Sequence, residues 1–269
     1  MAHPHADLLF SGGPILTMDG ARTWASSLAV RDGRVVAIGH DEVKEPAGPR
    51  TEVVDLRGRL LLPGFQDAHV HAVMGGGELG QCDLTGTTYP QEYARRIRAY
   101  ADANPGKEWI IGIAAATPDP ADGRIERRPA PGGTLQEGAV ALVGTLVPAL
   151  TTADRPTGLL RAQDLLHSLG IAAWQDAMVA GAEGYPDPSD AHLTAARDGR
   201  LTATVVGALW WARGQGTEQI PALLEQRDRL TCGRLRCDTV KIMVDAALAD
   251  TRVALTYASG ERVHTAPDA

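Results

Sequence analysis

The stretch Leu60-Leu-Leu-Pro-Gly-Phe-Gln-Asp-Ala-His-Val-His71 decides how the rest of this chain folds. An apolar run turns at Pro63-Gly64 and continues as a short strand that carries His69 and His71. Side chains two apart on a strand point to the same face, so Asp67 and both imidazoles are expected on one side. Two imidazoles at a strand end can bind one divalent cation such as zinc. The same pair also fits an ordinary strand end, and the pattern alone leaves both interpretations open.

Residues 7–62, which precede this strand, predict short β-strands separated by turns. Asp32-Gly33 lies between the apolar runs 27–31 and 34–38 and is the strongest hairpin signal in the chain. Because a sheet of only these strands would not be stable by itself, we expect another layer to cover it.

After His71 the apolar residues change to a pattern in which strands and helices alternate. The predicted strands are 66–71, 109–113, 171–178, 201–209 and 239–245, and the predicted helices are 88–101, 159–169, 189–197 and 220–230. Such alternation is typical of parallel βαβ units, and it predicts an α/β fold. Residues 257–268 predict a loop or tail.

Composition and charge narrow the class of protein. The chain has 269 residues, of which 44% are hydrophobic and 22% charged, as in ordinary globular proteins. Its formal net charge of −7 argues against a nucleic-acid or anionic-membrane partner. No apolar run reaches the roughly 20 residues that span a bilayer, and no signal peptide is visible, so we expect a cytoplasmic protein. Cys82, Cys232 and Cys237 lack metal or redox spacing and are expected to be free thiols.

The residues Pro63-Gly-Phe-Gln-Asp-Ala-His-Val-His71, directly after a β-rich leader, resemble the amidohydrolase superfamily. The resemblance is to the amidohydrolase 3 branch, which includes N-substituted formamide deformylase-like enzymes. It implies a metal-dependent-hydrolase fold, with a distorted (β/α)8 TIM-like barrel beside a small β-sandwich. On this basis residues 1–62 are expected to form the β-sandwich portion and residues 63–269 an incomplete (β/α) barrel.

The chain departs from the family pattern in two places. Five strands are predicted from residue 66 onward, whereas a closed barrel of this family has eight. A long segment that the family usually carries after residue 113 is also missing, although the resemblance resumes at 133–137 and 166–176. We therefore expect an internally deleted and C-terminally truncated relative.

The resemblance also implies a metal site. His69 and His71 match the family's first-strand ligand pair, and Lys241 is the next candidate ligand. In many members a strand lysine is carboxylated and bridges two metals, which a plain ammonium cannot do because it has no lone pair. Alternatively, Lys241 reaches water or pairs with Asp245. Asp67 is expected to hold an imidazole by its far nitrogen. The implied cofactor is one or two divalent cations, with zinc expected.

Other family ligands, two later histidines and a late aspartate, have no matching positions. His167 and His192 lie in helical runs and are expected at the surface, and His264 lies in the tail. Asp176 and Glu137 match family motifs, but a turn or capping role explains them equally well.

Three functions stay open at this point. The first is a hydrolase that cleaves C–N bonds other than peptide bonds in small amide or formamide substrates through a metal-activated water. In that case a homo-oligomer could supply the missing ligands. The second is a catalytically inactive remnant of such an enzyme. The third is a deaminase or a dihydroorotase-like cyclic amidase, because the superfamily shares the His-x-His strand.

Overall fold

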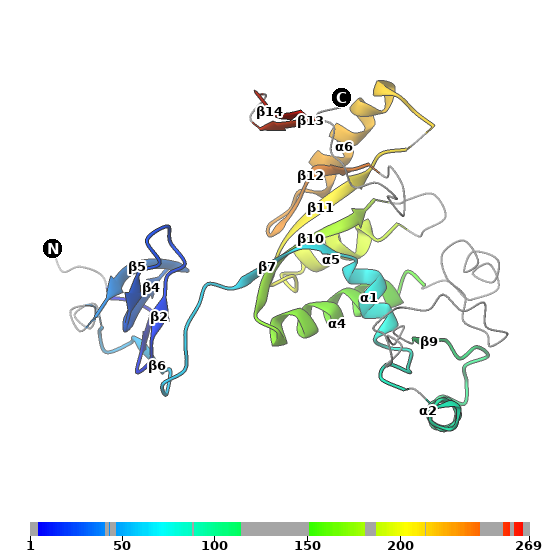
Figure 1. Ribbon diagram of the computed structural model, residues 1–269, viewed down its shortest axis with the longest axis horizontal. Coiled ribbons are helices and arrows are strands. Elements are labelled where there is room, and N and C mark those ends of the chain that lie inside the picture. Colours follow the sequence, from blue (N-terminus) through cyan, green and yellow to red (C-terminus); the bar gives the residue numbers. More distant parts are fainter. Residues whose placement is uncertain are drawn as a thin grey trace. The chain divides into compact units, whose positions relative to one another are not determined.

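The computed structural model of this chain describes residues 5–40, 43, 47–87, 89–113, 151–180, 187–212 and 214–242, and the backbone of two further strands at 255–258 and 261–265. Contacts divide the chain into two compact units (Figure 1). Unit 1 comprises Met1–Gln66 and Gly170–Ala172, and unit 2 comprises Asp67–Leu169 and Ala173–Ala269.

Unit 1 contains a sheet with the strand order β5-β4-β1-β6. These strands are β1 (Leu8–Ser11), β4 (Ser27–Arg31), β5 (Arg34–Gly39) and β6 (Glu52–Asp55), and a separate pair consists of β2 (Ile15–Leu16) and β3 (Trp24–Ala25). Asp32 and Gly33 have φ angles of 52° and 71°, the left-handed conformations that a tight two-residue hairpin requires. The hairpin predicted from Asp32-Gly33 is therefore present.

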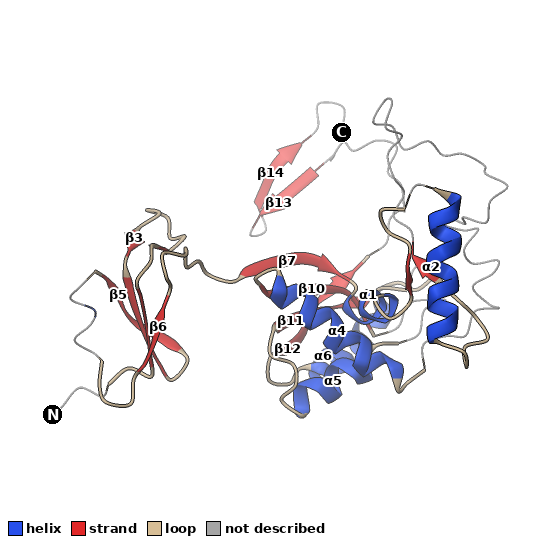
Figure 2. Cartoon of the chain, turned by 90° about the horizontal axis from the view of Figure 1, so that it is seen from below, coloured by secondary structure: helices blue, strands red, loops and turns tan. Residues whose placement is uncertain are grey.

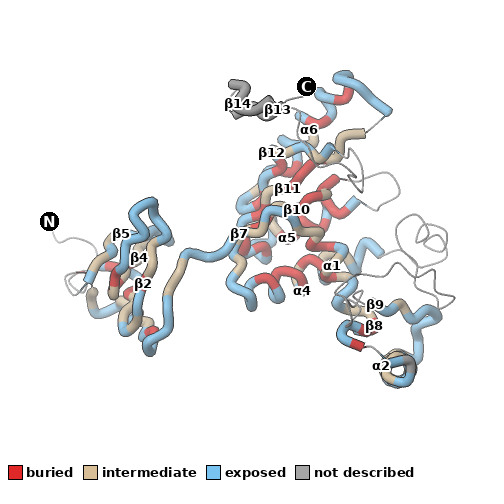
Figure 3. The backbone as a smooth tube through the Cα atoms, in the orientation of Figure 1, coloured by how far each residue is buried: buried red, intermediate tan, exposed pale blue. Residues whose placement is uncertain are grey.

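The core of unit 1 is small. One cluster contains Ala6, Leu9, Ala29 and Val43, and another contains Ile15, Ala25 and Leu56. Large apolar side chains elsewhere in the unit, among them Val35, Ile38 and Val53, are exposed. Figure 3 shows how buried and exposed stretches are distributed along the backbone. Two small clusters of apolar side chains thus form the described core of this unit.

Unit 2 is built on a sheet with the order β12-β11-β10-β7. Its strands are β7 (Phe65–Val70), β10 (Ile171–Val179), β11 (Thr204–Trp210) and β12 (Leu235–Lys241). The helices are α1 (Ala72–Glu78), α4 (Asp154–Ser168), α5 (Ser189–Arg197) and α6 (Ile220–Leu230), with a short 3-10 turn η2 (Thr217–Gln219) before α6. Figure 2 shows α4, α5 and α6 gathered on one side of the sheet.

The strands of this sheet run in one direction. β10 is parallel to β11, and β11 is parallel to β12. The amide of Phe65, at the start of β7, donates to the carbonyl of Gly170, directly before β10, at 2.8 Å. Because all four strands then end at the same edge, His71, directly after β7, and Lys241, the last residue of β12, belong to one edge of the sheet.

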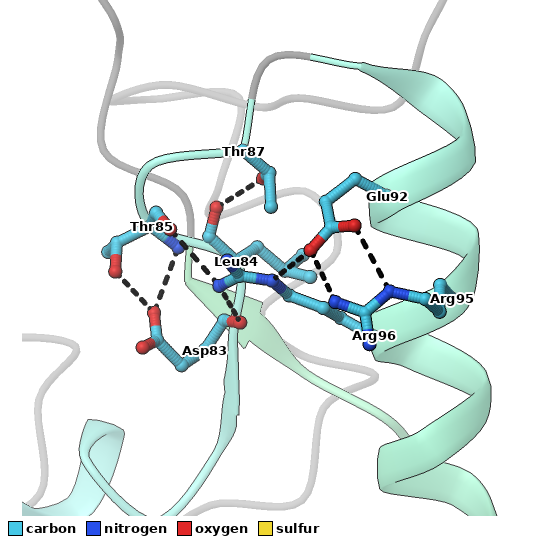
Figure 4. Close-up of polar contacts among 7 residues, drawn as sticks. All are labelled: Asp83, Leu84, Thr85, Thr87, Glu92, Arg95 and Arg96. Atoms are coloured by element: carbon cyan, nitrogen blue, oxygen red, sulfur yellow. Dashed lines mark hydrogen bonds and ion pairs between the residues drawn. The ribbon is translucent and has the colours of Figure 1, made fainter.

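A smaller substructure follows α1. The two-residue strands β8 (Cys82–Asp83) and β9 (Gly112–Ile113) pair in parallel, and α2 (Pro90–Ala103) lies between them in sequence. Arg96 links α2 to β8 and the loop after it, because its Nη1 atom donates hydrogen bonds to the carbonyl oxygens of Asp83 and Thr85 at 3.1 Å each (Figure 4). Glu92 receives hydrogen bonds from both Arg95 and Arg96, which lower its pKa to about 2.

The predicted mixture of strands and parallel βαβ units is confirmed, although several of the described elements were not anticipated. These are β3, α1, β8, η2 and the antiparallel pair β13 (Leu255–Ala258) and β14 (Glu261–Thr265). The prediction of a loop over 257–268 was wrong, because β13 and β14 form a hairpin there. The strand predicted at 239–245 is shifted to Leu235–Lys241, and residues 243–245 lie outside the described part of the chain.

Candidate metal centre

The two histidines lie side by side at the carboxyl end of β7. His69 is exposed and His71 is half-buried, and the centroids of their rings are 5.2 Å apart with the planes at 83°. This arrangement follows from the strand itself, because residues two apart share a face and Val70 between them points to the other. The expected juxtaposition of the two imidazoles is therefore present.

His71 has the properties of a neutral imidazole. Its Nδ1 atom is buried and has no hydrogen-bond partner among the described residues. Burial lowers the pKa of His71, and the charges of His69 and Lys241 lower it further, while Asp176 opposes them. Neutral imidazole is the form that binds metals. The hydrogen bond from the Ala72 amide to Oδ2 of Asp176, at 3.2 Å, places this carboxylate beside the residue that follows His71.

Lys241 and Asp67 complete the set predicted from the sequence. Lys241 is the half-buried last residue of β12, opposite Trp210 of β11, and its carbonyl accepts a hydrogen bond from Trp211. The Asp67 carboxylate accepts a hydrogen bond from the backbone amide of His69 at 3.0 Å. Asp67 therefore restrains the backbone of His69, in place of the ring contact that the sequence suggested.

Sequence reasoning missed a buried charged pair beside the histidines. Asp176, inside β10, is 2% exposed, and His192, on α5, is 0% exposed. The Nε2 atom of His192 lies 3.0 Å from Oδ2 of Asp176. The prediction that His192 lies at the surface was wrong. A signal for the pair was present in the sequence, since a carboxylate inside the apolar strand Ile171–Val179 requires a buried partner.

Both nitrogens of His192 face acceptors. Nε2 faces the Asp176 carboxylate, and Nδ1 lies 3.1 Å from the carbonyl oxygen of Pro188. An imidazole that donates to both must carry two protons. Burial lowers the pKa of His192, but the hydrogen bond and charge of Asp176 and the bond to Pro188 outweigh burial, so its pKa is raised. The two acceptors beside the ring therefore favour the protonated form of His192.

The remaining candidates are dispersed. His167 is exposed on α4 and bonds Thr202 through its Nε2 atom at 2.9 Å, and His264 lies in β14. Glu137 and Asp245 lie outside the described residues. Across the described ranges, no group of three or more His, Cys, Asp or Glu side chains is arranged to hold a metal ion. Within the described part of the chain, His69 and His71 thus form a pair of adjacent imidazoles without a third such side chain grouped with them.

Comparisons with known proteins bear on the same strand. Residues 52–114, which include the histidine pair, match the model of the amidohydrolase family. Imidazolonepropionase of Symbiobacterium thermophilum is 41% identical over 132 residues, covering 40% of this chain and 31% of that protein. N-substituted formamide deformylase of Arthrobacter pascens is 28% identical over 110 residues, covering 40% of this chain and 20% of that protein.

A solved structure extends the likeness in fold. An uncharacterized metal-dependent hydrolase from Pyrococcus furiosus superposes with a TM-score of 0.58 at 20% identity, covering 89% of this chain and 57% of that chain. The present chain thus spans less than a third of each of the two relatives and little more than half of the solved structure. The family match lies on the histidine strand, the relatives match in sequence and the fold is shared. The comparisons therefore support the amidohydrolase superfamily for this chain, on the match at residues 52–114 and the relatives that share it.

Proposed function

We propose that this chain carries the first metal ligands of a hydrolase that acts on C–N bonds other than peptide bonds. The observation that carries the proposal is the pair of adjacent imidazoles at the carboxyl end of β7, one of which has a buried nitrogen with no hydrogen-bond partner among the described residues. A ligand at that position would satisfy the nitrogen. The likeness to the amidohydrolase superfamily supports a small amide or formamide as the substrate.

The donor set suits a divalent cation. His69 and His71 would hold it through neutral ring nitrogens, the ligands that zinc accepts. Lys241, at the same edge of the sheet, would serve as a further ligand after its amine has reacted with carbon dioxide to give a carbamate and a proton. A bound cation, one or two zinc ions in this proposal, supplies the Lewis acidity that activates water and polarises a carbonyl. Asp67 holds the backbone of His69 in place.

The fold and surroundings fit the same proposal. The sheet β7-β10-β11-β12 would be one part of a TIM-like barrel, whose functional groups lie at the carboxyl ends of the strands. The net charge of −7 favours a small-molecule substrate over nucleic acid. None of the described helices is both long and apolar enough to cross a membrane. A cytoplasmic location and a homo-oligomer stay predictions.

A second candidate is a catalytically inactive relative that binds metal weakly. The observation that favours it is the dispersed ligand set. Among the described residues no third His, Cys, Asp or Glu side chain is grouped with the two imidazoles, and a site with two ligands binds metal weakly. The two candidates differ in metal stoichiometry and turnover.

The test combines metal analysis with a substrate panel. Zinc is measured by plasma emission in the wild type, in the double variant His69→Ala/His71→Ala and in the control His167→Ala, which removes an exposed histidine on α4. We expect about one zinc or more per chain in the wild type and the control, and none in the double variant. Hydrolysis of N-substituted formamides and N-acyl amines should stop on chelation and return with zinc.

Two results would decide against an amide or formamide hydrolase. Sub-stoichiometric metal that the double substitution leaves unchanged, together with no turnover, would establish the inactive relative. Release of ammonia from amino-substituted heterocycles, with the amides untouched, would point to a deaminase.

A further inference from the structure

Asp176 connects three elements through one buried carboxylate. Its Oδ2 atom accepts hydrogen bonds from the amide of Ala72 at 3.2 Å and from Nε2 of His192 at 3.0 Å. Its Oδ1 atom accepts from the amide of Met178 at 3.2 Å. The carboxylate of β10 therefore joins the start of α1 to α5.

Burial fixes this carboxylate in one position. Asp176 is 2% exposed and His192 is 0% exposed, and His192 is itself held by the carbonyl of Pro188. Removing one member of such a pair leaves an uncompensated charge in the interior, which is costly. The carboxylate of Asp176 therefore cannot turn towards water. The Ala72 amide that donates a hydrogen bond to it is held in place as well.

The bonded amide belongs to the residue directly after His71. His71 is the N-cap of α1, and no side chain of that helix caps its first amides. Asp176 supplies an acceptor there from another strand, which satisfies an amide that would otherwise be orphaned. The peptide plane between His71 and Ala72 is thereby fixed relative to β10, and so is the backbone from which the His71 ring projects.

We infer that Asp176, backed by His192, is a positioning residue that holds His71 at the orientation a cation requires. The inference rests on the proposed function for the identity of the ligand, whereas the restraint on the backbone rests on the hydrogen bonds alone. Residues that orient metal ligands in this way change metal affinity by about 10- to 100-fold when they are replaced.

The first test is the zinc affinity of Asp176→Asn, measured with zinc alone in competition with a chromophoric chelator. Asparagine keeps the size of the side chain but replaces one acceptor oxygen by an amino group, so it cannot accept all three hydrogen bonds. We expect a loss of zinc affinity of about 10-fold or more. An affinity within twofold of the wild type would overturn the inference.

Gln163 offers a matched control in the same unit. Its side chain is 5% exposed, donates to the carbonyl of Arg200 and accepts from the amide of Thr202, before the amino end of β11. Gln163→Ala thus removes a buried polar link at the opposite edge of the sheet. It should lower the midpoint of urea unfolding while leaving zinc affinity unchanged. An equal loss of affinity in both variants would reduce Asp176 to a general structural role and overturn the inference.

A readout without metal separates this inference from the proposed function. Hydrogen exchange at the Ala72 amide should be at least tenfold faster in Asp176→Asn than in Gln163→Ala, and unchanged exchange would overturn the restraint. If His69→Ala/His71→Ala binds zinc as well as the wild type does, the proposed function fails. The exchange rate of the Ala72 amide still tests whether Asp176 restrains the backbone after His71. Should Asp176→Asn not fold, His192→Gln replaces it in both measurements, with a smaller loss of at least threefold expected.

Discussion

The protonation of His192 is decided by its neighbours, because burial alone would favour the neutral ring. Desolvation opposes the charge, yet the ring can donate to the acceptors on both of its sides only when it carries two protons. A neutral ring would give up one of these two hydrogen bonds, and a hydrogen bond to a charged group contributes about 1.5–3 kcal/mol. The hydrogen bonds therefore win over burial.

This balance predicts a pH-dependent stability. The folded state raises the pKa of His192, so its contribution is complete below the unfolded pKa of about 6.5 and is lost as pH rises through the folded pKa. Against His192→Gln, which cannot titrate, the wild type should be more stable at pH 6 by about 1–3 kcal/mol. Urea unfolding between pH 6 and 9 should show this difference shrinking. A difference that grows with pH would contradict the assigned imidazolium.

Thiol reactivity gives a second prediction. Burial raises the pKa of Cys237 to about 12, and both Cys237 and Cys82 are buried, whereas Cys232 is partly exposed. The thiolate is the reactive form, so Cys237 should be inert in the native protein. A colorimetric thiol reagent at pH 8 should label Cys232 rapidly and all three cysteines after unfolding. Rapid native labelling of Cys237, located by peptide mapping, would show that β12 is not packed as described.

Helix α1 forms against its own sequence preference. It contains Gly75, Gly76 and Gly77, and each glycine disfavours a helix by roughly 1 kcal/mol relative to alanine. Tertiary packing compensates, because a Cβ on Gly76 would lie 1.8 Å from the carbonyl oxygen of Gly158 in α4. Two glycines facing each other thus let the backbones of α1 and α4 approach closely.

The same helix supplies a matched pair of substitutions. A Cβ on Gly75 would meet nothing within 4 Å, whereas one on Gly76 would collide with backbone. Gly75→Ala should therefore stabilise the protein by up to about 1 kcal/mol, through helix propensity. Gly76→Ala should destabilise it by about 1–3 kcal/mol, the usual cost of overpacking. Equal effects in urea unfolding would contradict the close approach of α1 and α4.

Elements with strong local signals could be predicted, and those made by packing could not. Asp32-Gly33 fixes the β4–β5 hairpin through backbone conformation alone, and the apolar run at 171–179 is long enough to be recognised as β10. Helix α1 depends on Gly158, more than 80 residues away, and therefore left no local pattern. For the same reason the His-x-His pair was recognised in the sequence, while its contact with the distant Asp176–His192 pair was not.

Each of the two units of the molecule has its own hydrophobic core. The clusters around Leu9 and Ile15 lie in unit 1, while the largest buried side chains of unit 2 include Trp174, Leu209 and Leu235. Units that bury their own apolar residues can unfold separately, so a single two-state transition is not expected. The candidate metal ligands His69, His71 and Lys241 all belong to unit 2.

Zinc should therefore stabilise only one of two unfolding transitions. A ligand that binds the folded state alone adds RT ln(1 + [L]/Kd), about 2.7 kcal/mol at a concentration 100 times the Kd. In calorimetry, added zinc should raise the Tm of the unit 2 transition, which Gly76→Ala identifies by lowering it, and leave the unit 1 transition in place. His69→Ala/His71→Ala should abolish the shift. A zinc shift that persists in this variant, or that moves the unit 1 transition, would mean that the cation binds elsewhere.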